Sequence, residues 1–197
     1  MGRFGIKAAL AGLASLLVIA HTAVTTAPAQ ASPYVHAHRG GSLVTGAAEQ
    51  RPRFPENTMP VFRDAAARGF VLELDVRLTA DRVPVVIHDI TLDRTTDCEG
   101  PVESITFADL RSRCEADLLG TDETVRKLGP RDRQRARVPS LQQVLRLAKR
   151  ERATLNVEVK NVPTDSDFDP SPTFVRAVAN AIRDSGVPPS RLIVQSF

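Results

Sequence analysis

Short apolar segments alternate with helical patterns along most of this chain. The apolar segments, each predicted to be a strand, are residues 34–38, 70–76, 83–89, 154–160 and 191–197. Helical patterns cover about 58–68, 140–150 and 170–185, with a short helix near 107–113 in the polar excursion at 90–138. This alternation, without a regular antiparallel pattern, predicts a parallel sheet covered by helices, an α/β fold.

Two of the predicted strands have acidic residues on one face. Glu73 and Asp75 alternate with apolar residues in the segment 70–76, and Glu158 does the same in 154–160. Carboxylates on the inner face of a buried strand are costly without a counter-charge. At the carboxyl ends of barrel strands, where active sites gather, they are well placed as ligands. We therefore expect these three carboxylates to meet at one mouth of the sheet.

Further polar groups stand at the same ends of the strands. They are His38, Arg39, His88 and Lys160, with Glu56 and Asn57 at the start of the first helix. The three carboxylates form an all-oxygen cluster suited to Mg²⁺ or Ca²⁺. Two histidines on different strands can divide the roles of general base and general acid. Arginine and lysine supply positive charge for a phosphate.

Seven short motifs stand in order between residues 37 and 160: AHRGG, PENT, ELDV, VPVVIHD, LDRTT, VPSLQQVL and VEVK. Together they closely resemble the glycerophosphodiester phosphodiesterase family. The resemblance implies a TIM-type (β/α)8 barrel with a small inserted segment. It also implies hydrolysis of small-molecule glycerophosphodiesters to glycerol 3-phosphate and an alcohol, through a cyclic phosphate, with Ca²⁺ or Mg²⁺ as cofactor.

The resemblance assigns a role to each matched position. It implies His38 and His88 as the acid/base pair, Glu73, Asp75 and Glu158 as metal ligands, Arg39 and Lys160 as phosphate-binding groups, and Glu56 as a supporting residue.

The chain departs from the family pattern in three places. The loop from Gly41 to Phe54 is longer than usual, and Arg82 stands where a turn glycine is normal. The resemblance also stops at residues 194–197, although a (β/α)8 barrel has about 250 residues. We expect a domain over 32–197 that is truncated after about strand five. We expect it to be poorly soluble or weakly active unless it is extended by about 60–90 residues.

Several alternatives remain open. The pair His36 and His38 also fits a metal-dependent amidohydrolase, but that family needs histidines on later strands, and only His36, His38 and His88 follow the N-terminal segment. We therefore predict that His36 is an inward side chain one layer below the site. A phospholipase-D-like phosphodiesterase acting on lipid head groups and a non-catalytic binding remnant are the rival functions. The carboxylates could instead be paired structurally with Arg39, Arg77 or Lys160.

The N-terminal segment has the pattern of a signal peptide. Arg3 and Lys7 precede an apolar run, and Ala29-Gln30-Ala31 has the small-x-small form of a cleavage site. This predicts cleavage after Ala31 and a secreted protein with no later membrane span, the alternative being an uncleaved anchor. Loss of Arg3 and Lys7 lowers the formal charge of +3 by two. A nearly neutral domain gives no reason to expect a nucleic-acid partner.

Cys98 and Cys114 are the two cysteines of the chain. In an exported protein such a pair predicts one disulfide, the alternative being two free thiols. Closing this loop would stabilise the fold by about 3 kcal/mol in the chain-entropy picture.

Overall fold

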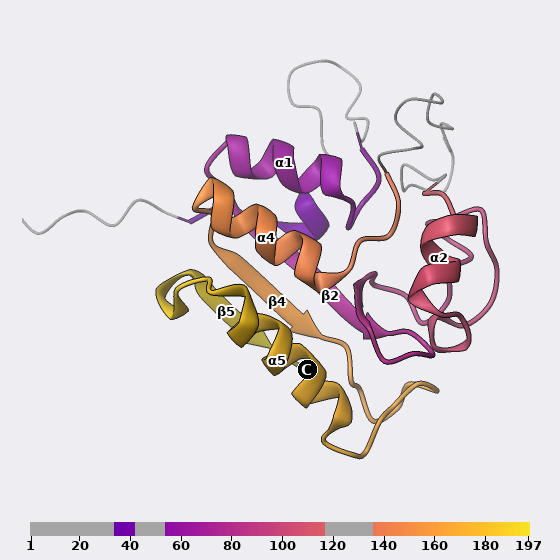
Figure 1. Cartoon of the computed structure of the whole chain (residues 1–197). Coiled ribbons are helices and arrows are strands. Elements are labelled where there is room, and N and C mark those ends of the chain that lie inside the picture. Colours follow the sequence, from indigo (N-terminus) through magenta and orange to yellow (C-terminus); the bar gives the residue numbers. More distant parts are fainter. Residues whose placement is uncertain (1–33, 42–53, 117–135) are drawn as a thin grey trace, which may run out of the picture. The chain divides into compact units, whose positions relative to one another are not determined.

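The computed structural model describes residues 34–41, 54–116 and 136–197. The predicted signal peptide and nearly all of the long loop 41–54 lie outside these residues. The described part forms one sheet of five strands (Figure 1). The strands are β1 (His36–Ala37), β2 (Val71–Leu78), β3 (Pro84–Val86), β4 (Leu155–Val159) and β5 (Leu192–Gln195).

Four of these strands are parallel and lie side by side in the order β1-β2-β4-β5. Parallel neighbours place their carboxyl ends at the same edge of the sheet. The register sets Asp75 of β2 opposite Glu158 of β4, and Glu73 opposite Asn156. The predicted convergence of the two acidic strands is therefore built into the pairing of β2 with β4.

The strand predicted at 83–89 is shorter than expected and has the opposite direction. β3 pairs antiparallel with β2, so that Val86 lies opposite Val76. The link between β2 and β3 is too short for the crossover of a dozen or more residues that a parallel strand needs. Arg82 adopts a positive φ of 60° in this turn, and its N–H donates to the carbonyl of Thr79. The described residues thus contribute four parallel strands, one fewer than the sequence predicted.

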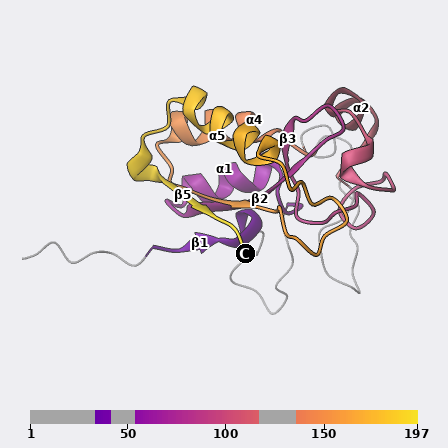
Figure 2. The same ribbon diagram turned by 90° about the horizontal axis from the view of Figure 1, so that it is seen from below.

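Three helices cover the sheet from the same side (Figure 2). They are α1 (Met59–Ala67), α4 (Leu141–Glu151) and α5 (Thr173–Ser185). Helix α4 begins at a reciprocal cap, in which Ser140 accepts from the N–H of Gln143 and the Gln143 side chain accepts from the N–H of Ser140. Fully buried leucines and Phe62 fill the layer between these helices and the sheet. The apolar face of β2 and β4 is thereby covered, and the acidic face is left for the site.

The excursion after β3 packs as a separate small cluster. It contains α2 (Phe107–Arg113) and the short 3-10 helix η2 (Val102–Ser104), which surround Leu92, Val102 and Leu110. The sulfurs of Cys98 and Cys114 are 2.09 Å apart, at bonding distance, within this cluster. The predicted pairing of the two cysteines therefore agrees with the structure.

Two further 3-10 turns adjoin the edge strands. Turn η1 (His38–Gly40) follows β1, and η3 (Pro189–Arg191) precedes β5. Gly40 has a φ of +90°, and a Cβ there would lie 2.3 Å from Cγ1 of Val61 in α1. Glycine is needed at this position because it alone fits between η1 and α1.

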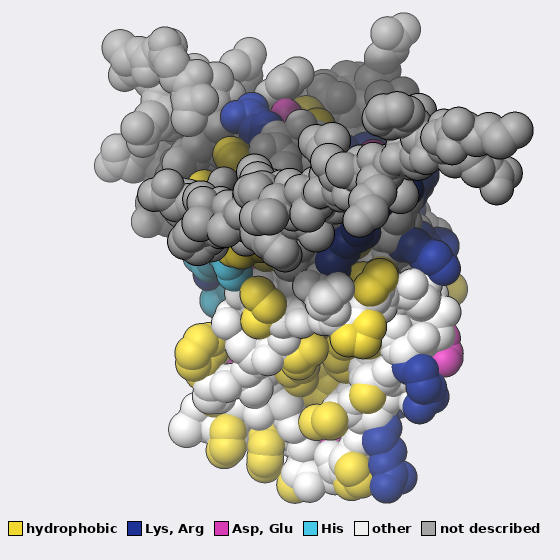
Figure 3. Space-filling view, turned by 90° about the vertical axis from the view of Figure 1, so that its left-hand side faces the viewer, with side chains coloured by type: hydrophobic (Ala, Val, Ile, Leu, Met, Phe, Trp, Pro, Cys, Tyr) yellow, Lys and Arg dark blue, Asp and Glu magenta, His cyan; other side chains and the backbone are white. Residues whose placement is uncertain are grey.

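Apolar side chains are exposed along both outer strands of the described sheet. Tyr34 and Val35 flank β1, and Ile193 and Val194 lie on β5. Figure 3 shows hydrophobic side chains spread over one side of the molecule. None of the helices in the described part of the chain is both long and apolar enough to span a membrane.

Candidate active site

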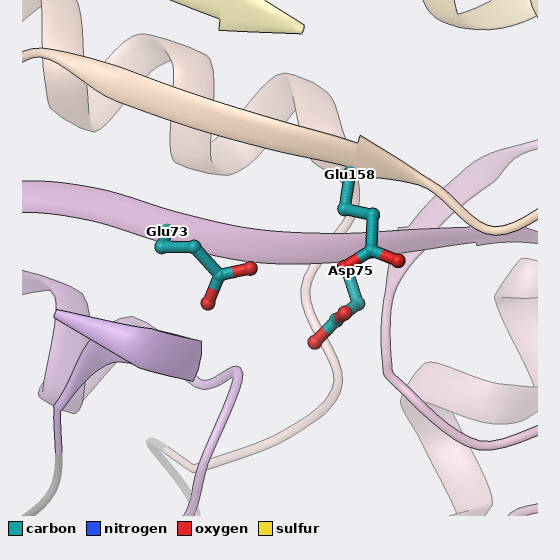
Figure 4. Close-up of side chains that lie close together, drawn as sticks. All are labelled: Glu73, Asp75 and Glu158. Carbon is teal, nitrogen blue, oxygen red and sulfur yellow. The ribbon is translucent and has the colours of Figure 1, made fainter. Parts of the chain in front are cut away.

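Three buried carboxylates meet at the carboxyl ends of β2 and β4. Glu73 and Asp75 project from β2 and Glu158 from β4, on the same side of the sheet (Figure 4). One oxygen of each lies within 4.8 Å of the others, and the residues are 5%, 0% and 8% exposed. Such a group suits a hard cation with oxygen ligands. It is the only group of this kind among the residues that the structure describes.

The surroundings of Glu73 disfavour the ionised form of its carboxyl group. Burial raises the pKa of its carboxyl, and repulsion by Asp75 and Glu158 adds to this, against the hydrogen bond from the backbone N–H of Arg39 and the charge of His38. That N–H lies 2.5 Å from Glu73 Oε2. A carboxyl with a raised pKa beside two others indicates that the cluster favours additional positive charge.

Two cations border the carboxylates. Lys160 Nζ lies 2.7 Å from Glu158 Oε1 and 3.4 Å from Asp75 Oδ1. Arg39 Nε lies 3.7 Å from Asp75 Oδ2. The structural ion pairing considered from the sequence is therefore present for Arg39 and Lys160. Arg77 makes no described ion pair with the three carboxylates, because its ion pairs are with Asp165 and Asp167.

Three buried polar atoms at the site have no hydrogen-bond partner: Asp75 Oδ1, Asn57 Oδ1 and Arg39 Nε. The contact of Lys160 with Asp75 Oδ1 is an ion pair without hydrogen-bond geometry. Unpaired buried polar atoms are rare and costly. Two of the three are oxygens beside the carboxylate cluster, so the residues present fit a divalent cation. The third is a donor, which fits an anion.

Asn57 was grouped with Glu56 from the sequence, but it was given no role of its own. Its side-chain amide donates to Asp75 Oδ2 at 2.9 Å, and its backbone N–H donates to the carbonyl of Arg39. Asn57 has a φ of +55°, a conformation that asparagine tolerates better than most residues. The signal in the sequence was the motif PENT, of which only Glu56 was given a role.

His38 and His88 reach the site from two different segments. His38 begins η1, directly before Arg39, and its charge acts on Glu73. His88 follows β3, where the N–H of Ile87 donates to the carbonyl of Asp75 and fixes the chain beside β2. Both side chains are partly open to solvent, as a proton-transfer group requires.

Asp89 orients His88. Its Oδ1 lies 2.6 Å from His88 Nδ1. Burial opposes ionisation of Asp89, but hydrogen bonds from Arg94 and His88 outweigh it and lower its pKa to about 2. An ionised carboxylate only accepts hydrogen bonds, so Nδ1 carries the proton of this contact and Nε2 is directed elsewhere.

Arg94 was also missed by the sequence analysis, where it appeared only within the motif LDRTT. Its guanidinium contacts both Glu56 and Asp89, and the hydrogen bonds to Glu56, followed by those to Asp89, raise its pKa. Glu56 in turn accepts from Arg39 Nη1 at 3.1 Å. Glu56 is therefore joined to two arginines and makes no described contact with the three clustered carboxylates.

Arg77, almost fully buried on β2, ties neighbouring segments together. Its Nε donates to the carbonyl of His88 at 2.8 Å, and Nη1 lies 3.5 Å from the carbonyl of Lys160. The same side chain forms ion pairs with Asp165 and Asp167 of the β4–α5 connection. Arg77 therefore fixes the backbone of two candidate site residues and does not neutralise the acidic cluster.

His36 contacts Asn156, below the site on the same face of the sheet, but the residue is exposed to solvent, so its place inside a barrel stays a prediction. Its Nδ1 is 3.3 Å from Asn156 Nδ2, and Asn156 precedes Glu158 by one inward position on β4. It takes no part in the group of clustered ligands.

The charged side chains gathered at the site do not balance. With the histidines neutral, three cations face five carboxylates, which leaves a net charge of −2 when all are ionised. The groups are Arg39, Arg94 and Lys160, and Glu56, Glu73, Asp75, Asp89 and Glu158. One divalent cation would restore neutrality.

A fold of parallel strands with one helix-covered face and acids at the strand ends is that of the TIM-type barrels. Residues 38–197 match the sequence profile of the glycerophosphoryl diester phosphodiesterase family. This chain belongs to that family, whose members are phosphoric diester hydrolases. The family resemblance predicted from the seven motifs is thereby confirmed, and so is the barrel fold class.

Relatives with known names agree. Glycerophosphodiester phosphodiesterase 1 of Mus musculus is 36% identical over 132 residues, which cover 63% of this chain and 33% of the relative. The glycerophosphodiester phosphodiesterase of Caldanaerobacter subterraneus is 35% identical over 128 residues, 64% of this chain and 45% of the relative. The chain thus spans less than half the length of these relatives.

Solved structures give the same fold. The glycerophosphodiester phosphodiesterase of Agrobacterium tumefaciens superposes with a TM-score of 0.61 at 28% identity, over 84% of this chain and 58% of that structure. The glycerophosphoryl diester phosphodiesterase domain of a Mycobacterium tuberculosis protein gives 0.61 at 30% identity, over 83% and 52%.

Proposed function

We propose that this site hydrolyses glycerophosphodiesters to glycerol 3-phosphate and an alcohol with the help of Ca²⁺ or Mg²⁺. The observation that carries the proposal is the buried triad Glu73, Asp75 and Glu158 in a chain of this family. No separate observation favours the rival function, a phospholipase-D-like phosphodiesterase acting on lipid head groups.

The three carboxylates are the residues that would hold the cation. The unpaired oxygens of Asp75 and Asn57 and the net negative charge of the surrounding groups support this assignment. A divalent cation bound there supplies Lewis-acid stabilisation of the charge that develops on the phosphoryl oxygens.

Arg39 and Lys160 bind the phosphate. Arg39 has a buried Nε without a hydrogen-bond partner, while its Nη1 is held by Glu56. A guanidinium anchored at one nitrogen and free at another can present that N–H to an anionic oxygen. Lys160 adds a point charge close to Glu158.

His38 and His88 carry the protons. One imidazole removes the proton of the attacking hydroxyl, which is the neighbouring hydroxyl of the glycerol or that of a water molecule. The other donates a proton to the oxygen of the departing alcohol, so that no alkoxide is released. If the glycerol hydroxyl attacks, the alcohol departs from a cyclic phosphate, and a water molecule then opens that ring to give glycerol 3-phosphate. The Asp89 contact at Nδ1 leaves Nε2 of His88 as the nitrogen that takes up or gives the proton.

The test is the identity of the product. We expect ³¹P NMR to show glycerol 3-phosphate formed from glycerophosphocholine and glycerophosphoethanolamine in the presence of Ca²⁺ or Mg²⁺. The assay is run with this chain and with a form extended through a complete barrel. Absence of glycerol 3-phosphate in both forms with either cation, or release of phosphocholine instead, would contradict the proposal.

We further propose that the protein is exported after cleavage following Ala31. The bonded pair Cys98 and Cys114 supports this, because structural disulfides persist in oxidising compartments. N-terminal sequencing of the protein recovered from culture medium is expected to begin at Ser32. Recovery of the protein only from cells, with Met1 retained, would contradict export.

A further inference from the structure

One guanidinium joins two parts of the candidate site. Arg94 Nε and Nη2 donate to Asp89 at 2.5 and 3.1 Å, and Nη1 and Nη2 donate to Glu56 at 3.0 and 2.6 Å. Each carboxylate is thus held by two N–H groups of the same planar fork. Only arginine has the five donors in a fixed geometry that such a double contact needs.

Each of the two carboxylates contacts a different residue of the proposed active site. Asp89 contacts His88 Nδ1, and Glu56 contacts Arg39 Nη1. Glu56 precedes α1 and lies 38 residues before Arg94 in the sequence, whereas Asp89 follows β3 and lies 5 residues before it. A continuous chain of charged contacts therefore runs from Arg39 through Glu56, Arg94 and Asp89 to His88.

We propose that Arg94 is a positioning residue that fixes His88 and Arg39 relative to each other through Asp89 and Glu56. The proposal rests on the proposed function, in which His88 transfers a proton at the phosphate that Arg39 binds. Arg94 itself touches neither the acidic triad nor, in the described contacts, either histidine. Its effect is on geometry, and displacement of a reacting group by about 1 Å can lower a rate by about 100-fold.

The hydrogen bond to Asp89 also fixes which imidazole nitrogen carries the proton. While Arg94 holds Asp89 in place, neutral His88 is protonated at Nδ1 and its Nε2 has a free lone pair. Without the fork, Asp89 can rotate away, and His88 can exchange between its two neutral forms. This difference is visible in the ¹⁵N shifts of the imidazole and does not depend on turnover.

The experiment compares Arg94→Gln and Arg94→Lys with the control Arg68→Gln. Arg68 forms an ion pair with Asp64 at the end of α1, and its side chain is 39% exposed, as is that of Arg94. The variants are made in the form of the protein that is active as wild type. Melting temperature, turnover of glycerophosphocholine and the ¹⁵N shifts of His88 are measured for each.

We expect all three variants to fold. Arg68→Gln should melt as wild type does, because a single exposed ion pair contributes little stability, whereas the Arg94 variants should melt somewhat lower, because they break a bidentate network. Arg94→Gln should lower kcat by about 10- to 100-fold. Arg94→Lys, which keeps the charge but not the fork, should also remain at least about 5-fold below wild type. In Arg94→Gln the His88 shifts should move toward the average of the two neutral forms, and Arg68→Gln should match wild type in every measurement.

A kcat of Arg94→Gln within about twofold of wild type, with unchanged His88 shifts, would overturn the proposal. Full activity of Arg94→Lys would overturn the claim that the fork geometry matters. If Arg94→Gln does not fold, Arg94→Lys and its His88 shifts decide in the same way. If wild type shows no turnover, the proposed function fails, and the His88 shifts still decide whether Arg94 positions this imidazole.

Discussion

Replacement of Glu73 by glutamine is expected to stabilise the metal-free protein and to remove its response to calcium. Burial, reinforced by Asp75 and Glu158, raises the pKa of Glu73. The ionised form therefore destabilises the fold at pH 7, and this penalty disappears as the pH falls through the raised pKa. Glutamine removes the charge but keeps an oxygen that can accept from the N–H of Arg39.

The size of the effect follows from the distances. Two like charges 4.8 Å apart repel by ~3.5 kcal/mol at an effective dielectric constant of about 20. Lys160 and Arg39 offset most of this, because they lie within 4 Å of the other two carboxylates. We expect a net gain of about 1 kcal/mol for Glu73→Gln, or about 2–4 °C in melting temperature for a domain of this size.

Calcium should stabilise the wild-type protein but not the variant. At 100 times its dissociation constant a ligand stabilises by about 2.7 kcal/mol, so wild type should melt about 5–10 °C higher with calcium. Glu73→Gln should not respond. The assay is a thermal melt after dialysis against chelator, with and without calcium, and the exposed Glu103→Gln is the control that should behave as wild type. A metal-free Glu73→Gln that melts below wild type, or one that keeps the calcium shift, would refute this reasoning.

Two further predictions concern the histidines and the cysteines. Loss of His38 or His88 should lower the rate by about 10²–10⁴-fold, with the double variant little worse than the poorer single one. His36→Leu should keep most of the activity in steady-state assays. A loss as large as that of His38→Ala would instead favour the hypothesis that His36 and His38 are both metal ligands. Cys98 and Cys114 should be recovered as one linked peptide by non-reducing mass mapping, whereas alkylation of both without reduction would exclude the bridge.

The part of the site that could be predicted from sequence depends on strand geometry. Side chains alternate across a strand, and parallel strands end at one edge, so the positions of Glu73, Asp75 and Glu158 follow from their spacing. The helix predicted over 140–150 and the short helix near 107–113 were likewise local features, and the structure has both, at Leu141–Glu151 and Phe107–Arg113.

The parts that were missed depend on contacts between distant segments. The direction of β3 is set by the turn at Arg82, where the alternation of apolar residues fits either direction equally well. Arg94 meets Glu56 across 38 residues, and Arg77 meets Asp167 across 90. No periodicity encodes which carboxylate an arginine will reach, so these pairings require the folded structure.

The cation site is tested most directly by titrating Ca²⁺ into the chelator-dialysed protein in a calorimeter. We expect one ion to bind per chain at pH 7, and the double variant Glu73→Gln, Asp75→Asn to bind none at this site. The double variant should remain folded, because glutamine and asparagine keep the volume of the two side chains and an oxygen that can accept the hydrogen bonds from Arg39 and Asn57. Absence of binding to the wild-type protein, or equal binding to the folded double variant, would contradict the assignment of these carboxylates as metal ligands.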